Sequence, residues 1–157
     1  MARPRKSASA EPIALRLENF VPFRLNRLAA AVSEYLSAIY RTRFGLEIPE
    51  WRVLVTVGQR NDCTAQFIAA STRMHKTRVS RAVAALTERK LIERAANADD
   101  ARARHLQLTP SGRRLYAALV PFALERERVL LACLDEPQRR GLIAGLTGLE
   151  KFFKLAM

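Results

Sequence analysis

Five residues near the middle of the chain carry groups that bind phosphate oxygens and the edges of bases. Within the segment HKTRVSRAVAALTERK (75–90), these are Lys76, Thr77, Arg78, Ser80 and Arg81. No acidic residue appears in this segment before Glu88. Arginine binds phosphate or pairs with guanine in a bidentate way, and small hydroxyl residues allow close approach to a groove. The spacing predicts contact with double-stranded DNA; a solvated helix face, the alternative, usually mixes both signs of charge.

A second cationic group lies in the segment DDARAR (99–104). Arg102 and Arg104 are expected near the tip of a hairpin, where a loop can enter the minor groove of DNA. The alternative is a turn closed by an ion pair between Asp100 and either arginine. Both interpretations can hold together, because a carboxylate can orient an arginine that also contacts DNA.

Other kinds of site find little support in the sequence. His75 and His105 have no Cys or His at ligand spacing, so we expect no metal site. No glycine-rich phosphate loop is present, and hence no cofactor is expected. The chain also has no paired carboxylates in an apolar setting and no arrangement of Ser, His and Asp that could form a triad. An enzyme is therefore not expected.

The two cysteines, Cys63 and Cys133, are too few for a disulfide scaffold and fit a reducing cytosol. Cys63 is expected in a polar turn near Arg60, a setting that favours a reactive thiolate. Cys133, in LLACL, is expected to be a buried and inert thiol. Control of function by oxidation of Cys63 is left open as a hypothesis.

The overall charge agrees with a polyanionic partner. The 157 residues carry a net charge of +12, which favours nucleic acid over a membrane surface. Hydrophobic residues make up 49% of the chain, enough for one core. No apolar run reaches the ~20 residues of a membrane span, and the start lacks the apolar stretch of a secretory signal. We expect a cytoplasmic protein.

Three short helices and a hairpin would position the cationic groups. Gly58 is expected to end the first helix and Asp62 to cap the second, while the third has one apolar stripe at helical spacing: Val79, Ala82, Val83 and Leu86. Period-two alternation then indicates strands. The elements are expected at 49–58, 64–71, 75–89, 91–95 and 104–108. This order is that of a helix-turn-helix followed by a wing.

Long helices are expected on both sides of this unit. Residues 13–20 could form a short helix, and a long one would begin at Pro22 and end at Gly45. A further helix would begin at Thr109 and be kinked by Pro121, and the last one would span 136–154. The predicted organisation is a basic, flexible tail (1–11), N-terminal helices (12–45), a winged helix-turn-helix domain (46–109) and C-terminal helices (110–157); the family resemblance described next implies that both sets of terminal helices serve in dimerisation.

The stretch from Gly45 to Gly112 resembles the MarR family of bacterial transcription regulators. FGLEIPEWRVL is similar to the entry to that family's second helix, and VSRAVAALTERKLIER to its recognition helix and first wing strand. DDARARHLQLTPSG is similar to its wing signature. The signature residues stand in the expected order as Asp100, Arg102, Leu108, Thr109 and Gly112.

The resemblance implies a mostly α fold with a small β-wing, in which the terminal helices interlock as the base of a homodimer. Two recognition helices would then enter successive major grooves of a pseudo-palindromic operator, about 34 Å apart. It also implies that Arg102 contacts the minor groove, that Asp100 orients it and that Arg81 contacts DNA. Lys90 departs from the family, which often has glycine there, and a left-handed turn at this position would cost roughly 1 kcal/mol.

The resemblance further implies a repressor, less often an activator, that a small aromatic or phenolic ligand releases from DNA. Phe23, Arg24 and Arg27 would suit an aromatic carboxylate, although dimer packing and solvated charge explain them as well. The family's oxidant sensors keep a cysteine in the first helix, where this chain has none. A bacterial regulator of this kind would be associated with the nucleoid.

Two other functions remain as alternatives. One is a winged-helix adaptor that binds protein, which would not need Arg78, Arg81 and Arg102 together. The other is a nucleic-acid-binding protein without sequence specificity or ligand control. RNA binding is less favoured, because RNA-binding modules usually expose aromatic residues for stacking.

Overall fold

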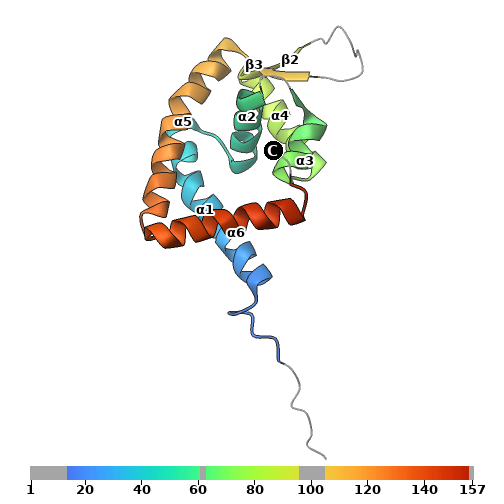
Figure 1. The fold of residues 1–157 in the computed structure, drawn as a ribbon. Helices are drawn as coiled ribbons and strands as arrows, with labels where there is room; N and C mark the ends of the chain where they lie inside the picture. The colour runs from blue at the N-terminus through green and yellow to red at the C-terminus, as the bar shows by residue number, and fades with distance from the viewer. Residues whose placement is uncertain (1–13, 61–62, 96–104, 156–157) are drawn as a thin grey trace, which may run out of the picture. The chain divides into compact units, whose positions relative to one another are not determined.

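The computed structural model describes residues 14–60, 63–95 and 105–155, which form six helices and three strands (Figure 1). The chain divides between Glu34 and Tyr35 into two units, which are described separately. The elements are α1 (Val21–Phe44), α2 (Ile48–Arg60), β1 (Cys63–Thr64), α3 (Ala65–Thr72), α4 (Lys76–Glu88), β2 (Ile92–Ala95), β3 (His105–Leu108), α5 (Pro110–Leu131) and α6 (Glu136–Phe152). The prediction of a mostly α fold with a small β-wing is confirmed.

The core of the second unit forms where α2, α3 and α4 pack together (Figure 1). The predicted apolar stripe of α4 is fully inside: its four residues are at most 6% exposed. α2 contributes Val53, Leu54 and Val57, and α3 contributes Ile68. The period of the apolar residues therefore identified α4 and its inward face correctly.

Three short strands cover one end of this core. The sheet is antiparallel in the order β1-β3-β2, with Cys63 opposite Leu106 and Ile92 opposite Leu108. The two wing strands were predicted. β1 was not, because a two-residue strand is too short to show an alternating pattern.

Several predicted helix boundaries need correction. Residues 14–20 contain a turn and no helix, so the part of the expected helix at 13–20 that the structure describes is wrong. Gly58 lies inside α2 and does not end it. A Cβ at Gly58 would lie 2.6 Å from the ring of Tyr116, so this glycine makes room for α5 to pack on α2. Asp62 is outside the described residues, and the N-cap of α3 is Thr64.

Thr109 and Gly112 explain the LTPSG segment at the start of α5. Thr109 is the N-cap, and its hydroxyl accepts a hydrogen bond from the Gly112 N–H at 3.0 Å. The same hydroxyl donates to the carbonyl of Lys90 at 2.6 Å. A Cβ at Gly112 would lie 1.8 Å from the carbonyl oxygen of Leu91. α5 can therefore begin against the end of α4 only if residue 112 has no side chain.

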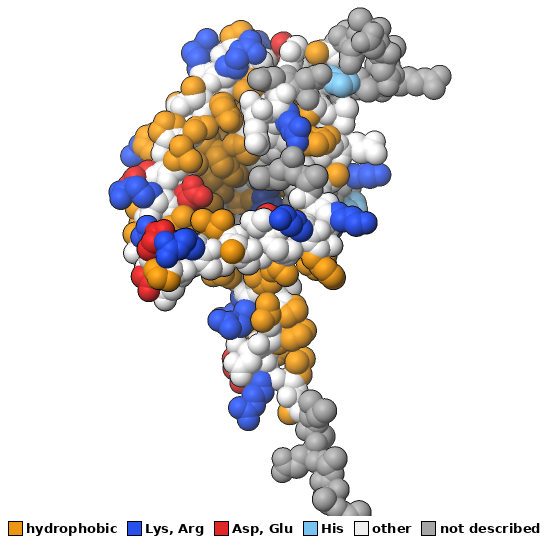
Figure 2. All heavy atoms as spheres, in the orientation of Figure 1, with side chains coloured by type: hydrophobic (Ala, Val, Ile, Leu, Met, Phe, Trp, Pro, Cys, Tyr) orange, Lys and Arg blue, Asp and Glu red, His pale blue; other side chains and the backbone are white. Residues whose placement is uncertain are grey.

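α6 begins with a complete capping box at Asp135 and Gln138, yet none of its residues is buried. The predicted stripe (Leu142, Leu146, Leu149 and Phe153) is present and faces solvent, together with Ile143. Large exposed hydrophobic residues also occur at Val21, Leu25 and Leu28 in α1. In the space-filling view, hydrophobic side chains gather along the N-terminal half of α1 and along one edge of α6 (Figure 2).

Candidate nucleic-acid interface

The turn between α3 and α4 fixes where the cationic helix begins. Arg73 adopts a left-handed conformation (φ 55°) at the end of α3, and Met74 anchors the turn in the core. His75 is the N-cap of α4, and its Nδ1 accepts a hydrogen bond from the Thr77 N–H at 3.3 Å. Sequence reasoning placed His75 at this start but missed its capping role, because histidine is an uncommon N-cap.

The predicted DNA-contacting side chains of α4 share one exposed face. Lys76, Thr77, Arg78, Ser80 and Arg81 are all exposed, while the apolar stripe of the same helix is buried. Lys76, Arg78 and Arg81 make no ion pair with another described residue. The helix therefore presents cations that have no ion-pair partner among the described residues, and Lys and Arg side chains line the edge of α3 and α4 in Figure 2.

A cavity of about 420 Å³ lies between α3, α4 and the first wing strand. Lys76 and Ser80 line it from α4, Gln66 from α3 and Arg94 from β2. Arg94 and Gln66 were not predicted as site residues. For Arg94 the signal was available, since it belongs to the run of cations that continues from α4 into the strand. These side chains extend the polar, cationic surface from α4 toward the wing.

A second cavity, of about 290 Å³, lies on the other side of α4, against the start of α2. Arg78 and Arg81 line it together with Glu47 and Glu50. Carboxylates near the cations on this side lower the local positive potential, whereas the charged residues that line the first cavity, Lys76 and Arg94, are both cations. The interface is thus more strongly basic toward β2 than toward α2.

The left-handed turn expected after the helix is present. Lys90 has φ 55°, and the Leu91 N–H donates to the carbonyl of Leu86 at 2.9 Å, the pattern of a Schellman motif. A non-glycine residue in this conformation costs roughly 1 kcal/mol. The chain therefore reverses direction at Lys90, which brings Ile92 into the core to begin β2.

The predicted wing-tip residues Asp100, Arg102 and Arg104 lie outside the described residues. The strands that lead to this segment are paired as far as Ala95 and His105. The contact of the wing with DNA therefore stays a prediction.

The residues predicted to bind an effector lie in the first unit. Phe23 is half-buried and Arg24 is exposed, and the guanidinium of Arg27 lies 5.7 Å from the centroid of the Phe23 ring. None of these residues lines the cavities described here.

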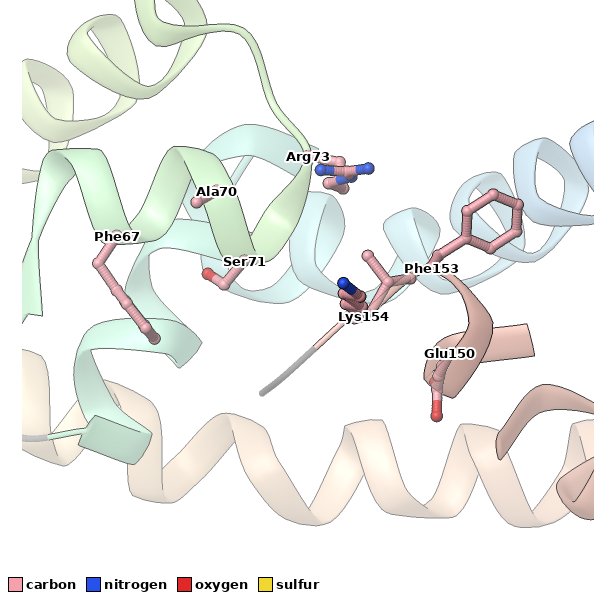
Figure 3. Close-up of a pocket in the computed structure, with 8 residues that line it drawn as sticks. Phe67, Ala70, Ser71, Arg73, Glu150, Phe153 and Lys154 are labelled. Atoms are coloured by element: carbon pink, nitrogen blue, oxygen red, sulfur yellow. The ribbon is translucent and has the colours of Figure 1, made fainter. Parts of the chain in front are cut away.

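Another cavity, of about 340 Å³, lies between the end of α3 and the end of α6, with Phe67, Arg73 and Lys154 among its lining residues (Figure 3).

The surroundings of the two cysteines are the reverse of those expected. Cys63 is buried in β1, opposite Leu106, so its predicted place in a polar turn is wrong. Cys133 is exposed just beyond the end of α5, where a buried thiol was expected. Burial from solvent makes Cys63 a poor redox sensor, because a sensor thiol must be accessible.

Two negative findings apply to the described residues only. Within residues 14–60, 63–95 and 105–155, no group of three His, Cys, Asp or Glu side chains is placed to hold a metal ion. In the same ranges, no helix has the length and hydropathy needed to cross a membrane.

Comparisons with known proteins agree on one family. A family model described as the MarR family matches residues 44–103. A MarR/EmrR family transcriptional regulator from Acinetobacter sp. ADP1 is 30% identical and has a TM-score of 0.80, with 90% of this chain and 100% of that chain covered. No curated protein sequence matches this chain significantly.

Two more distant structures support the fold. A putative MarR family regulator from Listeria monocytogenes, solved in complex with a 26mer DNA, has a TM-score of 0.74 at 17% identity, covering 85% of this chain and 87% of that one. BpsR of Bordetella bronchiseptica, whose DNA binding is regulated by 6-hydroxynicotinic acid, has a TM-score of 0.67 at 22% identity, covering 81% and 98%.

Proposed function

This chain belongs to the MarR family of transcriptional regulators, which bind DNA and are not enzymes, and from that premise we propose how it acts. A homodimer binds a pseudo-palindromic operator in double-stranded DNA and represses transcription by occluding a promoter. A small aromatic or phenolic ligand releases it. The protein would act in the bacterial cytoplasm, on the nucleoid.

The observation that carries sequence-specific binding is the exposed face of α4. Arg78 and Arg81 are free of described ion pairs on a helix whose other face is fixed in the core. A rigid helix with two free guanidinium groups can enter the major groove and contact guanine in a bidentate way. Ser80, between them, is small enough to permit close approach. In this proposal Lys76 and Thr77 contact phosphate, as does Arg94.

The homodimer is supported by where the exposed hydrophobic residues lie. Among the described residues, large exposed hydrophobic side chains occur at 15–28 and at 124–155, and none between those ranges. Large hydrophobic side chains that are exposed in groups on the same helices mark an interaction site. A second copy is the occupant that would place two recognition helices on one operator with two-fold symmetry.

Ligand control is supported by the relative that 6-hydroxynicotinic acid regulates and by cationic and aromatic side chains on this chain. Phe23, Arg24 and Arg27 remain the proposed ligand-binding residues. If the ligand binds one arrangement of the dimer better than the DNA-competent one, it shifts the population away from DNA. A thermal-shift screen with benzoates and phenols tests this step, and no stabilisation by any compound would contradict it.

The decisive experiment is selection from a library of random duplexes, followed by affinity measurements over a salt series. We expect enrichment of a two-fold symmetric motif and an affinity that falls steeply with salt. Arg102→Ala should then weaken binding by about 1–3 kcal/mol if the wing contacts bases. Salt-sensitive binding without enrichment would indicate a protein that reads only phosphates. The absence of binding would favour a protein-binding adaptor.

A further inference from the structure

The side chain of Arg89, at the end of the recognition helix α4, turns back into the protein. Its Nη1 donates to the carbonyl of Gly45 at 2.9 Å and its Nη2 donates to the carbonyl of Phe44 at 3.0 Å. These carbonyls belong to the end of α1, where helix geometry leaves acceptors without partners in the helix. A cation at this position also interacts favourably with the negative end of the helix dipole.

Glu50 connects the same guanidinium to the start of α2. Its Oε2 lies 3.7 Å from Nη1 of Arg89 and accepts a hydrogen bond from the Glu47 N–H at 2.9 Å. The Glu50 side chain is only 17% exposed, whereas that of Arg89 is 38% exposed. Arg89 therefore joins three helix ends: those of α4 and α1, and the beginning of α2.

The helix α5 is attached to the two residues that follow Arg89, namely Lys90 and Leu91. The Thr109 hydroxyl donates to the carbonyl of Lys90, and the Thr109 N–H donates to the carbonyl of Leu91 at 3.1 Å. Gly112 allows α5 to begin against this same carbonyl. Residues 89–91 thus bind the end of α1 through the side chain of Arg89 and the start of α5 through the carbonyls of Lys90 and Leu91.

We propose that Arg89 is a positioning residue, which fixes the recognition helix against the end of α1, at Phe44 and Gly45, without contacting DNA. In a dimer held through α1, α5 and α6, this attachment sets the separation between the two recognition helices. Arg89 would therefore determine which half-site spacing the protein accepts. The inference rests on the proposed function, because half-site spacing has meaning only for a dimer on DNA.

The alternative role of an exposed arginine beside a DNA-binding helix is a phosphate contact. The variants Arg89→Lys and Arg89→Gln separate the two roles. Lysine keeps the charge but has no planar fork to reach two carbonyls at once. A phosphate contact would survive in Arg89→Lys, whereas the paired hydrogen bonds to the carbonyls of Phe44 and Gly45 would be lost in both variants.

The test measures binding of the full-length protein to the selected operator and to versions with half-sites one base pair closer or further apart. In both variants we expect the preference for the selected spacing to fall by at least about fivefold, the lower end of ordinary coupling between sites. The dependence of affinity on salt should stay as in the wild type. Arg114→Gln, which removes an exposed cation near the start of α5 and outside the exposed hydrophobic range 124–155, should leave the preference unchanged.

Two further measurements separate positioning from a general loss of stability. Hydrogen exchange at Leu46, whose N–H donates to the carbonyl of Tyr40, should quicken in both variants while exchange in the α4 core stays slow. Glu50→Gln keeps the hydrogen bonds of Arg89 to the end of α1 and removes only the negative charge beside its guanidinium. This variant should therefore give a smaller change in spacing preference. This variant carries the test if the Arg89 variants fold poorly.

Several results would overturn the inference. Wild-type behaviour of Arg89→Lys, with a salt slope reduced by about one in Arg89→Gln, would make Arg89 a phosphate contact. An unchanged spacing preference in all three variants would remove any positioning role. Failure of the wild type to select an operator would overturn the proposed function itself, a result that is visible before any variant is made.

Discussion

The helices α4 and α6 both have an apolar face, which is buried in α4 and exposed to solvent in α6. In α4 the stripe is buried inside the chain, with Val79 at 1% and Leu86 at 0% exposure. In α6 the equivalent stripe is open, with Ile143 at 59% and Leu146 at 43% exposure. The polar face of α4 carries cations that have no ion-pair partner among the described residues. Among the ion pairs between described residues, α6 instead has one within its own polar face, between Arg140 and Glu136.

An apolar stripe in the sequence therefore predicts that one helix face packs against something. It does not tell whether the partner is another helix of the same chain or another molecule. The α4 stripe packs on α2 and α3, elements close to it in the sequence. The stripe of α6 has no such neighbour within the described residues, and in the proposed homodimer a second chain covers it. Four predictions sharpen or break this contrast, from the largest expected effect to the smallest.

The first prediction concerns the close contact at the start of α5. Gly112→Ala should lower the free energy of unfolding by about 3 kcal/mol, because the added methyl group would overlap the Leu91 carbonyl. Thermal or denaturant unfolding measures it. The matched control is Gly148→Ala in α6, where a Cβ meets no other atom within 4 Å. There alanine should stabilise by about 0.5–1 kcal/mol through helix propensity. Equal effects at both sites would contradict the contrast.

The second prediction concerns the open stripe. Leu146→Glu should raise the dimer dissociation constant by on the order of 100-fold, because a carboxylate would be buried at the interface without a partner. Sedimentation over a range of concentrations measures this constant. Ala144→Glu places the same group on nearly the opposite side of the helix from Leu146, because two residues turn it by about 200°, and should leave association nearly unchanged. A dimer indifferent to both substitutions would show that the stripe of α6 is not its interface.

The third prediction concerns the cationic face. Arg81→Ala should weaken operator binding by about 1–3 kcal/mol and relax the choice of base at one position. Its side chain is exposed, so the unfolding free energy should change little. Fluorescence anisotropy with matched and mismatched operators measures both effects. Loss of affinity with specificity intact would reassign Arg81 to a phosphate contact.

The smallest expected effect compares two helix caps. Asp135→Ala, at the start of α6, should cost about 1 kcal/mol of stability. Thr109→Ala, at the start of α5, should cost about 1 kcal/mol more, because the Thr109 hydroxyl also binds the carbonyl of Lys90. Chemical denaturation of the two variants side by side tests the order. Equal losses would mean that the bond to Lys90 contributes little.

The sequence predicted the features that depend on near neighbours along the chain. Helical spacing located α4 and its inward face, and the order of helices and strands located the wing. The exposed face of α4 followed, because the cations lie opposite the stripe. The resemblance to the family, which often has glycine at this position, implied a left-handed turn at Lys90, and the structure has φ 55° there.

Features that depend on distant contacts were missed. Cys63 is buried because β3 pairs with it from more than forty residues away, and no local pattern records this. Gly58 resembled a helix end, but its role is to receive the ring of Tyr116. Arg89 is one of the cations of the segment 75–90, and nothing near it in the sequence indicates that its partners are the carbonyls of Phe44 and Gly45.

The pairing of β1 with β3 also bears on how the molecule opens and folds. These strands close a loop that contains α3, α4 and β2, and the entropic cost of closing this loop is offset only when the strands pair and the helices pack beside them. The recognition helix should therefore neither fold nor unfold alone. Its amides should exchange with solvent together with those of the sheet, as one cooperative unit, while α6 exchanges earlier and independently.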